Sequence, residues 1–288
     1  MSARKIVVVD DHGLWGAEWA RVLQDQRPGR YEVLPVDSPS AMAKCLDKDP
    51  DIWLVVCDMD FYRVTADTGL SALITAEAHA RRRPNDRPLH TIVSTVDDND
   101  NRFLFLHTAF QCFNPAPVDL IFKDTEFDRA ALGAVDALAR GDRPSSHRFA
   151  RFTRNGLDEP LIRQLLGGKC NSAGVPIKLA IWKALAGISA DPGDTIRGVQ
   201  QLQAVTGFTS KHIYTYLNPA LEVAQALAAD MRMPPRSVLD APAPGKRREA
   251  NDVLSGLREF AVLHMLFFQA PELPDLVRDR LIDRGRGK

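Results

Sequence analysis

The chain has few cysteines. Its 288 residues include only four, at positions 45, 57, 112 and 170, and these lie far apart, without CxxC spacing or a neighbouring histidine cluster. Such a pattern argues against a disulfide framework and against a cysteine-based metal site. We expect reduced, mostly buried thiols of the kind found in cytosolic proteins.

Long apolar runs are also missing. No run approaches the ~20 residues that a membrane-spanning helix needs. The first residues, MSARKIVVVDD, enter a strand-like apolar run at once and meet acidic residues there, so we expect no signal peptide. These absences predict a cytoplasmic protein without a membrane partner.

Net charge is absent as well, since 37 Lys and Arg residues balance 37 Asp and Glu residues. The balance hides an asymmetry: residues 1–140 contain 16 basic and 22 acidic residues, whereas residues 141–288 contain 21 and 15. A basic half beside an acidic half points to a polyanion as the partner of the second half. The overall composition, 45% hydrophobic and 26% charged, is that of an ordinary globular protein.

The first 140 residues alternate between strand-like and helix-like patterns. Short apolar, β-branched runs predict strands at 5–9, 31–36, 52–57, 90–96 and 118–122. Helical periodicity predicts helices at 14–26, 38–48, 69–83, 102–113 and 127–140, with Ser38 as a cap. Five such βα units in roughly 135 residues predict an α/β domain with a doubly wound parallel sheet.

The second half has a different organisation. Residues 141–156, GDRPSSHRFARFTRNG, are polar, basic and contain Gly and Pro, so we place a linker there, between a domain at 1–140 and a domain at 157–288. Beyond the linker the strand signals vanish and the domain is mainly α-helical. We expect helices at 177–186, 194–206, 210–217, 249–269 and 273–283, and a loop at 233–248.

Chemically active residues follow four of the five predicted strands. Asp10 and Asp11 end the first strand, Asp58 the third, Thr95 the fourth and Lys123 the fifth. In an open parallel sheet the ligand site lies outside the carboxyl ends of the strands, so these side chains should converge on one crevice. Acid pairs after strands are common in loops, but residues of this kind at four of five junctions are not supplied by chance.

Three crowded carboxylates repel one another and would protonate unless a hard cation neutralised them. Mg²⁺ fits, because it takes one or two carboxylates, keeps waters and leaves positions for phosphoryl oxygens. A carboxylate in that setting can be the nucleophile that becomes an aspartyl phosphate. Lys123 would then offer a positive charge to the phosphoryl group, and Thr95 a hydrogen bond.

These residues resemble the receiver domains of bacterial two-component response regulators, in the NarL/LuxR-like subclass that carries helix-turn-helix outputs. The resemblance covers residues 4–140, and its best-matching pieces are IVVVDDH (6–12), the apolar run that ends in Asp58, IVST (92–95) and IFKDTEF (121–127). It implies a flavodoxin-like (βα)5 fold and, as partner, a sensor histidine kinase or phosphotransfer protein.

The resemblance also implies a role for each residue of the crevice. Asp58 would accept the phosphoryl group, Thr95 would be the switch hydroxyl, and Lys123 would face the phosphate. Metal ligands would come from Asp10, Asp11 and Asp58, and from the backbone carbonyl of Asp60.

Some positions depart from the family pattern. Leu120 stands three residues before Lys123, where the family often has an aromatic switch residue, and no proline closely follows Asp58. Asp60 is a rival phosphoacceptor; we prefer Asp58 because it directly ends the apolar strand. A receiver that is inactive or constitutively poised is the remaining alternative.

An enzyme interpretation is also available. Asp58-Met59-Asp60 resembles the DxD start of haloacid-dehalogenase-like phosphatases. That family needs its last acidic pair downstream of the lysine and its DxD on the first strand, and neither holds here. We therefore expect a regulator and no enzyme.

The segment LQAVTGFTSKHIYTYL (202–217) predicts a helix, a Gly-containing turn and a second helix. Its apolar positions are Leu202, Val205, Phe208, Ile213 and Leu217, and Phe208 and Ile213 should pack the two helices together. The second helix, capped by Thr209, would be a recognition helix for double-stranded DNA. The residues predicted to contact DNA are Thr209, Ser210, Lys211, His212, Tyr214 and Thr215.

The apolar spacing of this segment resembles LuxR-type helix-turn-helix domains. It departs from them in the longer connection at 188–197 and in Asn218-Pro219, directly after the predicted recognition helix. Further on, residues 249–283 contain a strongly apolar helix, which we interpret as core or as the surface of a homodimer. His264 within it should be a core histidine.

Together these features predict a DNA-binding response regulator in which phosphorylation at Asp58 governs dimerisation or DNA access. The alternative is a receiver adaptor whose helical domain binds a protein partner, with or without control by phosphorylation.

Overall fold

The structure is a computed structural model, and it describes residues 3–59, 61, 68–84, 86–96, 102–144, 161–171, 174, 176–187, 198–229 and 250–282. The chain divides into two compact units, one formed by residues 1–99 and 105–154 and the other by residues 100–104 and 155–288.

The first unit is built on a five-stranded parallel sheet with strand order β2-β1-β3-β4-β5. The strands are β1 (Arg4–Val9), β2 (Tyr31–Val36), β3 (Ile52–Asp58), β4 (His90–Thr95) and β5 (Asp119–Phe122). This order reverses direction between β1 and β3, as expected for a doubly wound (βα)5 fold of the flavodoxin type. The predicted fold class is therefore confirmed.

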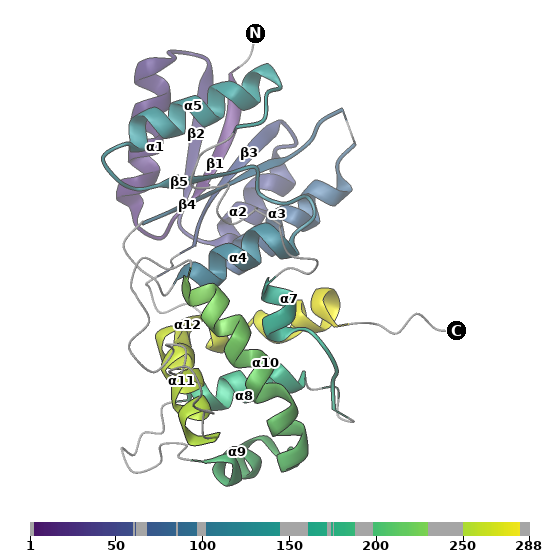
Figure 1. Cartoon of the computed structure of the whole chain (residues 1–288). Coiled ribbons are helices and arrows are strands. Elements are labelled where there is room, and N and C mark those ends of the chain that lie inside the picture. Colours follow the sequence, from purple (N-terminus) through teal and green to yellow (C-terminus); the bar gives the residue numbers. More distant parts are fainter. Residues whose placement is uncertain are drawn as a thin grey trace. The chain divides into compact units, whose positions relative to one another are not determined.

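Helices cover both faces of this sheet (Figure 1). They are α1 (Gly13–Gln26), α2 (Pro39–Lys48), α3 (Gly69–Arg82), α4 (Phe103–Cys112) and α5 (Phe127–Arg140). α1 and α5 contact each other on one face, and α2 and α3 contact each other on the opposite one. Side chains alternate across a strand, so Ile6 and Val8 of β1 point to the α1/α5 side, into a core that includes Trp19 and Phe127.

Local sequence signals position the helix starts near the crevice. The Ser38 hydroxyl accepts a hydrogen bond from the backbone N–H of Ala41 at 3.3 Å, which confirms the predicted cap of α2. Thr68 caps α3 and forms a reciprocal capping box with Ser71. Gly69 follows, and an added Cβ there would lie 2.5 Å from Cα of Met59. Only glycine lets α3 begin this close to the end of β3.

In the described part of the second unit the regular elements are helices, with two isolated bridges besides, Gly168 with Ile282 and Cys170 with Pro176. Its helices are α7 (Leu161–Leu166), α8 (Ile177–Ala186), α9 (Val199–Thr206), α10 (Ser210–Ala229), α11 (Ala250–Leu263), α12 (Met265–Gln269), α13 (Leu273–Leu276) and the π-helix η2 (Val277–Leu281). Trp182 of α8 stacks on Phe268 of α12 with ring centroids 5.1 Å apart, and both are fully buried.

The predicted recognition helix at 210–217 was too short. α10 continues for 20 residues to Ala229 with Pro219 inside it. An interior proline costs about 3 kcal/mol. Beyond Leu217, however, Leu221 and Leu227 are buried on the same helix, and each contributes roughly 1.5–3 kcal/mol. Continued apolar burial therefore outweighs the proline.

Other boundaries differ from the prediction too. The single helix expected at 249–269 is two helices, α11 and α12, separated at His264, and the helix expected at 273–283 is a four-residue α-helix followed by η2. His264 is fully buried, as predicted for a core histidine. The short α7 was not predicted, because six residues are too few to show a helical period.

Several predictions fall on residues outside the described part of the chain: the linker beyond residue 144, the loop at 233–248 and the connection at 188–197. All four cysteines are free thiols, but only Cys57 is buried and the others are half-buried, so the expectation of mostly buried thiols was wrong. Among the described helices, none has the length and apolar character required to cross a bilayer.

Candidate functional site

The carboxyl ends of the strands bring acidic residues and one lysine together. Nζ of Lys123, which follows β5, lies 2.6 Å from Oδ2 of Asp10 and 2.7 Å from Oδ2 of Asp58. All three side chains are nearly inaccessible to solvent. The predicted convergence of β1, β3 and β5 on one crevice therefore exists, and its charges are paired in a dry environment where Coulomb interactions are strong.

Backbone groups hold the two carboxylates. Oδ1 of Asp10 accepts a hydrogen bond from the N–H of His12 at 2.8 Å, and Oδ1 of Asp58 accepts one from the N–H of Met59 at 2.8 Å. In each carboxylate, one oxygen is thus fixed by the backbone while the other faces Lys123. The indole ring of Trp15 lies 5.6 Å from Lys123 Nζ and adds a cation–π contact. Sequence reasoning did not single out Met59 or Trp15.

Burial dominates the ionisation of Asp58. It raises the pKa of this carboxyl, the Lys123 ammonium lowers it, and the neighbouring charge of Asp10 raises it again. The net result is a pKa of about 7, well above the ordinary value of an aspartate. A partly protonated carboxyl is a poor nucleophile, so a further cation beside Asp58 would favour its reactive form.

The acidic residues fit a divalent metal ion. Asp10, Asp11 and Asp58 each offer a carboxylate oxygen, and these atoms lie within 4.8 Å of one another. Asp11 is half-buried, which leaves an open side for water or phosphoryl oxygens. Such a set of oxygen donors suits Mg²⁺. Asp60, the fourth predicted ligand and rival phosphoacceptor, lies outside the described residues.

The predicted switch hydroxyl lies at the end of β4. Thr95 is fully buried, and its Oγ1 atom has no hydrogen-bond partner in the described part of the chain. Its backbone carbonyl accepts the N–H of Lys123 at 2.8 Å, so the two residues are held side by side. A buried hydroxyl without a partner costs about 1–3 kcal/mol, which a new acceptor would recover. The Ser94 hydroxyl is also buried without a hydrogen-bond partner in the described part of the chain, and Ser94 was not predicted as a site residue.

The helix-turn-helix segment of the second unit has the predicted packing. α9 ends at Gly207, whose φ of 69° is the left-handed conformation that glycine adopts freely at helix ends. Phe208 in the turn and Ile213 in α10 are both buried, as predicted, and so is Leu202 of α9. Val205 is 67% exposed, so its assignment to the apolar face was wrong.

The start of α10 presents a polar and aromatic face to solvent. Thr209 caps the helix by accepting the N–H of His212, at 3.4 Å. Of the residues predicted to contact DNA, Ser210 is half-buried and the others are exposed: Thr209, Lys211, His212, Tyr214 and Thr215. The predicted face therefore exists as a surface.

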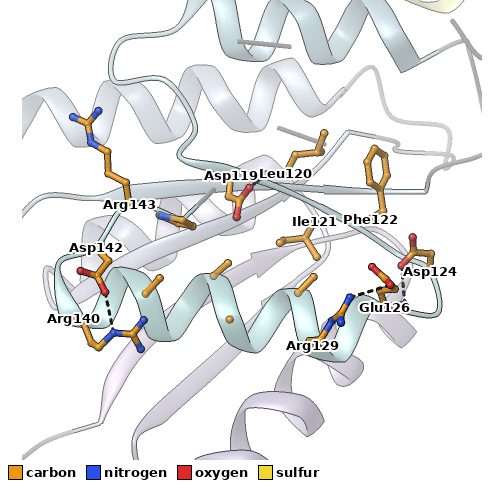
Figure 2. Close-up of a pocket in the computed structure, with 15 residues that line it drawn as sticks. Asp119, Leu120, Ile121, Phe122, Asp124, Glu126, Arg129, Arg140, Asp142 and Arg143 are labelled. Atoms are coloured by element: carbon orange, nitrogen blue, oxygen red, sulfur yellow. Dashed lines mark hydrogen bonds and ion pairs between the residues drawn. The ribbon is translucent and has the colours of Figure 1, made fainter. Parts of the chain in front are cut away.

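A groove of about 570 Å³ runs between β5 and α5, and Figure 2 shows its lining. Ion pairs occupy both ends, Arg129 with Glu126 at 2.9 Å and Arg140 with Asp142 at 2.9 Å. None of the predicted site residues lines it. Four carboxylates and three arginines line it, so it has no excess of positive charge.

Comparison with known proteins gives low similarities. No protein-family model and no curated protein matches the chain. The structural neighbours are response regulators. A complex of the two-component response regulator RcsB with DNA is 13% identical, with a TM-score of 0.49 over 77% of this chain and 92% of that chain.

The Salmonella typhimurium RcsB response regulator is 14% identical, with a TM-score of 0.42 over 77% of this chain and 92% of that chain. A LuxR-family two-component response regulator from Aurantimonas is 19% identical, with a TM-score of 0.39 over 52% and 94%. Likenesses this low transfer no residue role and no partner to the chain.

Proposed function

We propose that the chain is a DNA-binding response regulator controlled by phosphorylation of Asp58. The observation that carries this proposal is the buried contact of Asp58 with Lys123 at 2.7 Å, beside a metal-competent cluster with Asp10 and Asp11. This arrangement provides a nucleophile, a cation for the transferred group and a place for Mg²⁺ on one edge of the sheet.

The residues have distinct tasks in phosphoryl transfer from a histidine phosphoramidate. An Oδ atom of Asp58 forms the new P–O bond while the P–N bond breaks, and the electron pair leaves with the imidazole of the donor. Mg²⁺, when held by Asp10, Asp11 and Asp58, supplies positive charge to the phosphoryl oxygens. Lys123 exchanges its contact with Asp58 for one with the phosphoryl group, and the Thr95 hydroxyl donates the hydrogen bond it lacks in the resting chain.

The output proposal rests on α9 and α10. Their packed turn and the exposed Lys211, His212 and Tyr214 support insertion of the start of α10 into the major groove. Lys211 suits a phosphate, while His212 or Tyr214 suits a base edge or sugar. Phosphorylation would act by shifting an equilibrium of the chain toward a DNA-competent form, with homodimerisation as the usual means.

Labelling with a small phosphodonor tests the chemistry. With Mg²⁺, the purified chain should gain an acid-stable, base-labile phosphoryl group, and Asp58→Asn should abolish it. Asp10→Ala together with Asp11→Ala should remove the response to Mg²⁺. Labelling that persists in Asp58→Asn but disappears in Asp60→Asn would move the site by two residues.

Genome-wide capture of bound DNA, with and without Asp58→Ala, tests the output. We expect discrete bound sites whose occupancy depends on Asp58. A folded protein with no salt-dependent affinity for any duplex would instead support the receiver adaptor, whose helical unit binds a protein.

A further inference from the structure

A second hollow, of about 550 Å³, lies at the amino-terminal ends of the strands. Arg4 begins β1, Trp53 is the second residue of β3 and His90 begins β4, and all three line it. Because the strands are parallel, this hollow is at the opposite edge of the sheet from Asp58. Its volume is in the range of small-molecule sites in proteins.

Positive charge is in excess in this hollow. Four guanidinium groups line it, and only two carboxylates, those of Asp51 and Asp86, do so. The four arginines are Arg4, Arg83, Arg87 and Arg140. The first unit as a whole is acidic, so a local excess of two cationic groups is a departure from its surroundings.

The ion pairs in the described chain reduce this excess but do not cancel it. Arg87 lies 3.7 Å from Asp51, and both side chains are largely exposed. Arg140 pairs with Asp142, which does not line the hollow. Arg4 has no carboxylate partner among the described residues; its guanidinium lies over the Trp53 ring, with Cζ 4.9 Å from the ring centroid. Arg4 thus remains without an anion, and Arg87 has only this long, solvent-exposed pair.

The other polar groups that line the hollow also have few acceptors. Nε1 of Trp53 is buried and has no hydrogen-bond partner among the described residues. The Trp53 and His90 rings pack edge to face, with their centroids 5.8 Å apart. Arg83 donates to the backbone carbonyl of Ile52, and burial lowers its pKa despite the attraction of Asp49 and Asp51. Burial, and then the charge of Arg4, lower the pKa of His90. Trp53 Nε1 thus lacks an acceptor, and the charge that acts on His90 is that of a guanidinium.

The groove in Figure 2 can be compared with this hollow, because it has a similar volume and arginines also line it. There Arg129 and Arg140 each have a carboxylate at 2.9 Å. Arg140 lines both cavities. Apart from it, the hollow at the amino ends of the strands has three arginines, Arg4, Arg83 and Arg87, against the carboxylates of Asp51 and Asp86. An anion would supply the missing negative charge and acceptor oxygens.

We propose that this hollow binds a small phosphate-rich anion, such as inorganic pyrophosphate or the phosphate groups of a nucleotide. Guanidinium groups present paired N–H donors that match phosphate oxygens in bidentate fashion. The exposed guanidinium groups of Arg4 and Arg87 offer more than one such set of donors, and the volume accommodates more than a single phosphate. The site is independent of Asp58, so the chain would accept a chemical input besides phosphorylation.

Calorimetric titration of the full chain tests the site, with pyrophosphate, ADP and adenosine as probes. Chelator is present throughout, so that metal-mediated binding at Asp10, Asp11 and Asp58 does not contribute. We expect one equivalent of pyrophosphate to bind with a Kd tighter than about 1 mM, and adenosine not to bind. Tighter binding of ADP than of pyrophosphate would identify a nucleotide as the natural source of the phosphates.

Two exposed arginines allow variants that preserve the fold. Arg4→Gln and Arg87→Gln should each weaken binding roughly tenfold, the effect of losing one hydrogen bond to a charged group. Arg82→Gln is the matched control, because Arg82 is exposed, precedes Arg83 in the chain and does not line the hollow. Asp58→Asn should bind as well as the parent chain, which separates this site from the phosphorylation proposal.

A second readout places the ligand. NMR titration of His90 should show its pKa rising when pyrophosphate is saturating, since an anion beside the ring favours the imidazolium. The proposal is wrong if binding does not saturate, if Arg82→Gln weakens it as much as Arg4→Gln, or if the pKa of His90 stays unchanged at saturation.

Discussion

Lys123 and Asp58 form an ion pair with an N–O distance of 2.7 Å in which both side chains are less than 5% exposed. Removing two charges from water costs several kcal/mol each, and a single pair repays this only with good geometry and further hydrogen bonds. Here Lys123 also contacts Asp10 at 2.6 Å, and Met59 donates to Asp58. The single ammonium therefore offsets only part of the negative charge of the acids, and a divalent metal ion would offset the rest.

Replacing Lys123 should show how far the buried carboxylates of Asp10 and Asp58 depend on its positive charge. Lys123→Met leaves Asp10 and Asp58 buried together without a counter-charge, so the free energy of unfolding should fall by about 3–5 kcal/mol without Mg²⁺. Adding Mg²⁺ should stabilise the variant more than the parent chain, because the metal supplies the missing charge. Urea unfolding with and without Mg²⁺ measures both effects.

Lys5→Met is the control for this experiment. Lys5 pairs with Asp49 at 2.6 Å, but both side chains are partly exposed and lie away from the acidic cluster, so its loss should change stability less and should not alter the response to Mg²⁺. Equal responses to Mg²⁺ in the two variants would contradict a metal site beside Lys123.

Thr95 provides a separate prediction. Its buried hydroxyl has no partner in the described chain, so Thr95→Val replaces an unsatisfied group by an apolar one of similar shape. The resting chain should keep its stability or gain up to about 1 kcal/mol. Stabilisation by Mg²⁺ with beryllofluoride, a mimic of the phosphoryl group, should decrease, because the hydroxyl would donate to that group.

Thermal unfolding with and without the mimic measures this difference. Thr95→Ser keeps the hydroxyl and should retain the response to the mimic. It should be somewhat less stable than the parent chain, because it loses a buried methyl group. A full response in Thr95→Val would mean that the hydroxyl does not contact the phosphoryl group.

Much of the first unit could be predicted because its signals are local and repeated. Each strand is a short apolar run, and the residue that ends it identifies the ligand edge of the sheet, as for Asp58 and Thr95. The contacts that tune the site were not predictable in this way. The N–H of Met59 reaches Asp58 because of the backbone path after β3, and Trp15 reaches Lys123 because of how α1 packs on the sheet.

Errors in the second unit have a common physical origin, since tertiary burial overrides local signals. Pro219 predicted a helix end, yet Leu221 and Leu227 have a buried environment that keeps α10 continuous. The apolar run around His264 predicted one helix, whereas the chain breaks there into α11 and α12. Val205 matched the helical period but lies on the exposed side of α9.

A buried hydrogen bond away from the site predicts how stability depends on pH. The Tyr31 hydroxyl donates to Oδ1 of Asp136 at 2.7 Å, and Arg27 Nε donates to Oδ2 at 3.0 Å, which ties α5 to the start of β2. Burial, and then the hydrogen bond to Asp136, raise the pKa of Tyr31 from 10.0 to about 12. The folded chain thus holds this proton more tightly than the unfolded chain does.

The contribution of Tyr31 is therefore complete below pH ~10 and is lost as the pH rises from there toward 12. Tyr31→Phe should lower the free energy of unfolding at neutral pH by about 1–2 kcal/mol, and the difference from the parent chain should shrink above pH ~10. Tyr214→Phe, at a half-exposed position, should show neither effect. Chemical denaturation from pH 7 to 11 measures the differences, and a constant gap would contradict the assignment.

The start of α10 provides the last prediction, which concerns how the chain contacts DNA. Lys211 is exposed on the first turn of this helix, beside His212 and Tyr214. If this turn enters the major groove, Lys211 contacts a phosphate, and a phosphate contact is worth the same on every sequence. Lys211→Ala should weaken binding to specific and generic duplexes alike and reduce the slope of log K against log salt by about one.

Replacing a residue that contacts base edges should act differently. Tyr214→Ala or His212→Ala should cost about 1–3 kcal/mol at one operator position and relax the base preference there, with little change in the salt slope. Lys44→Ala, an exposed lysine on α2, is the charge-matched control and should leave both quantities unchanged. All four positions are on the surface, so thermal unfolding should barely change. Equal losses for Lys44→Ala and Lys211→Ala would mean that binding follows overall charge alone, and α10 would then not be the DNA-contacting surface.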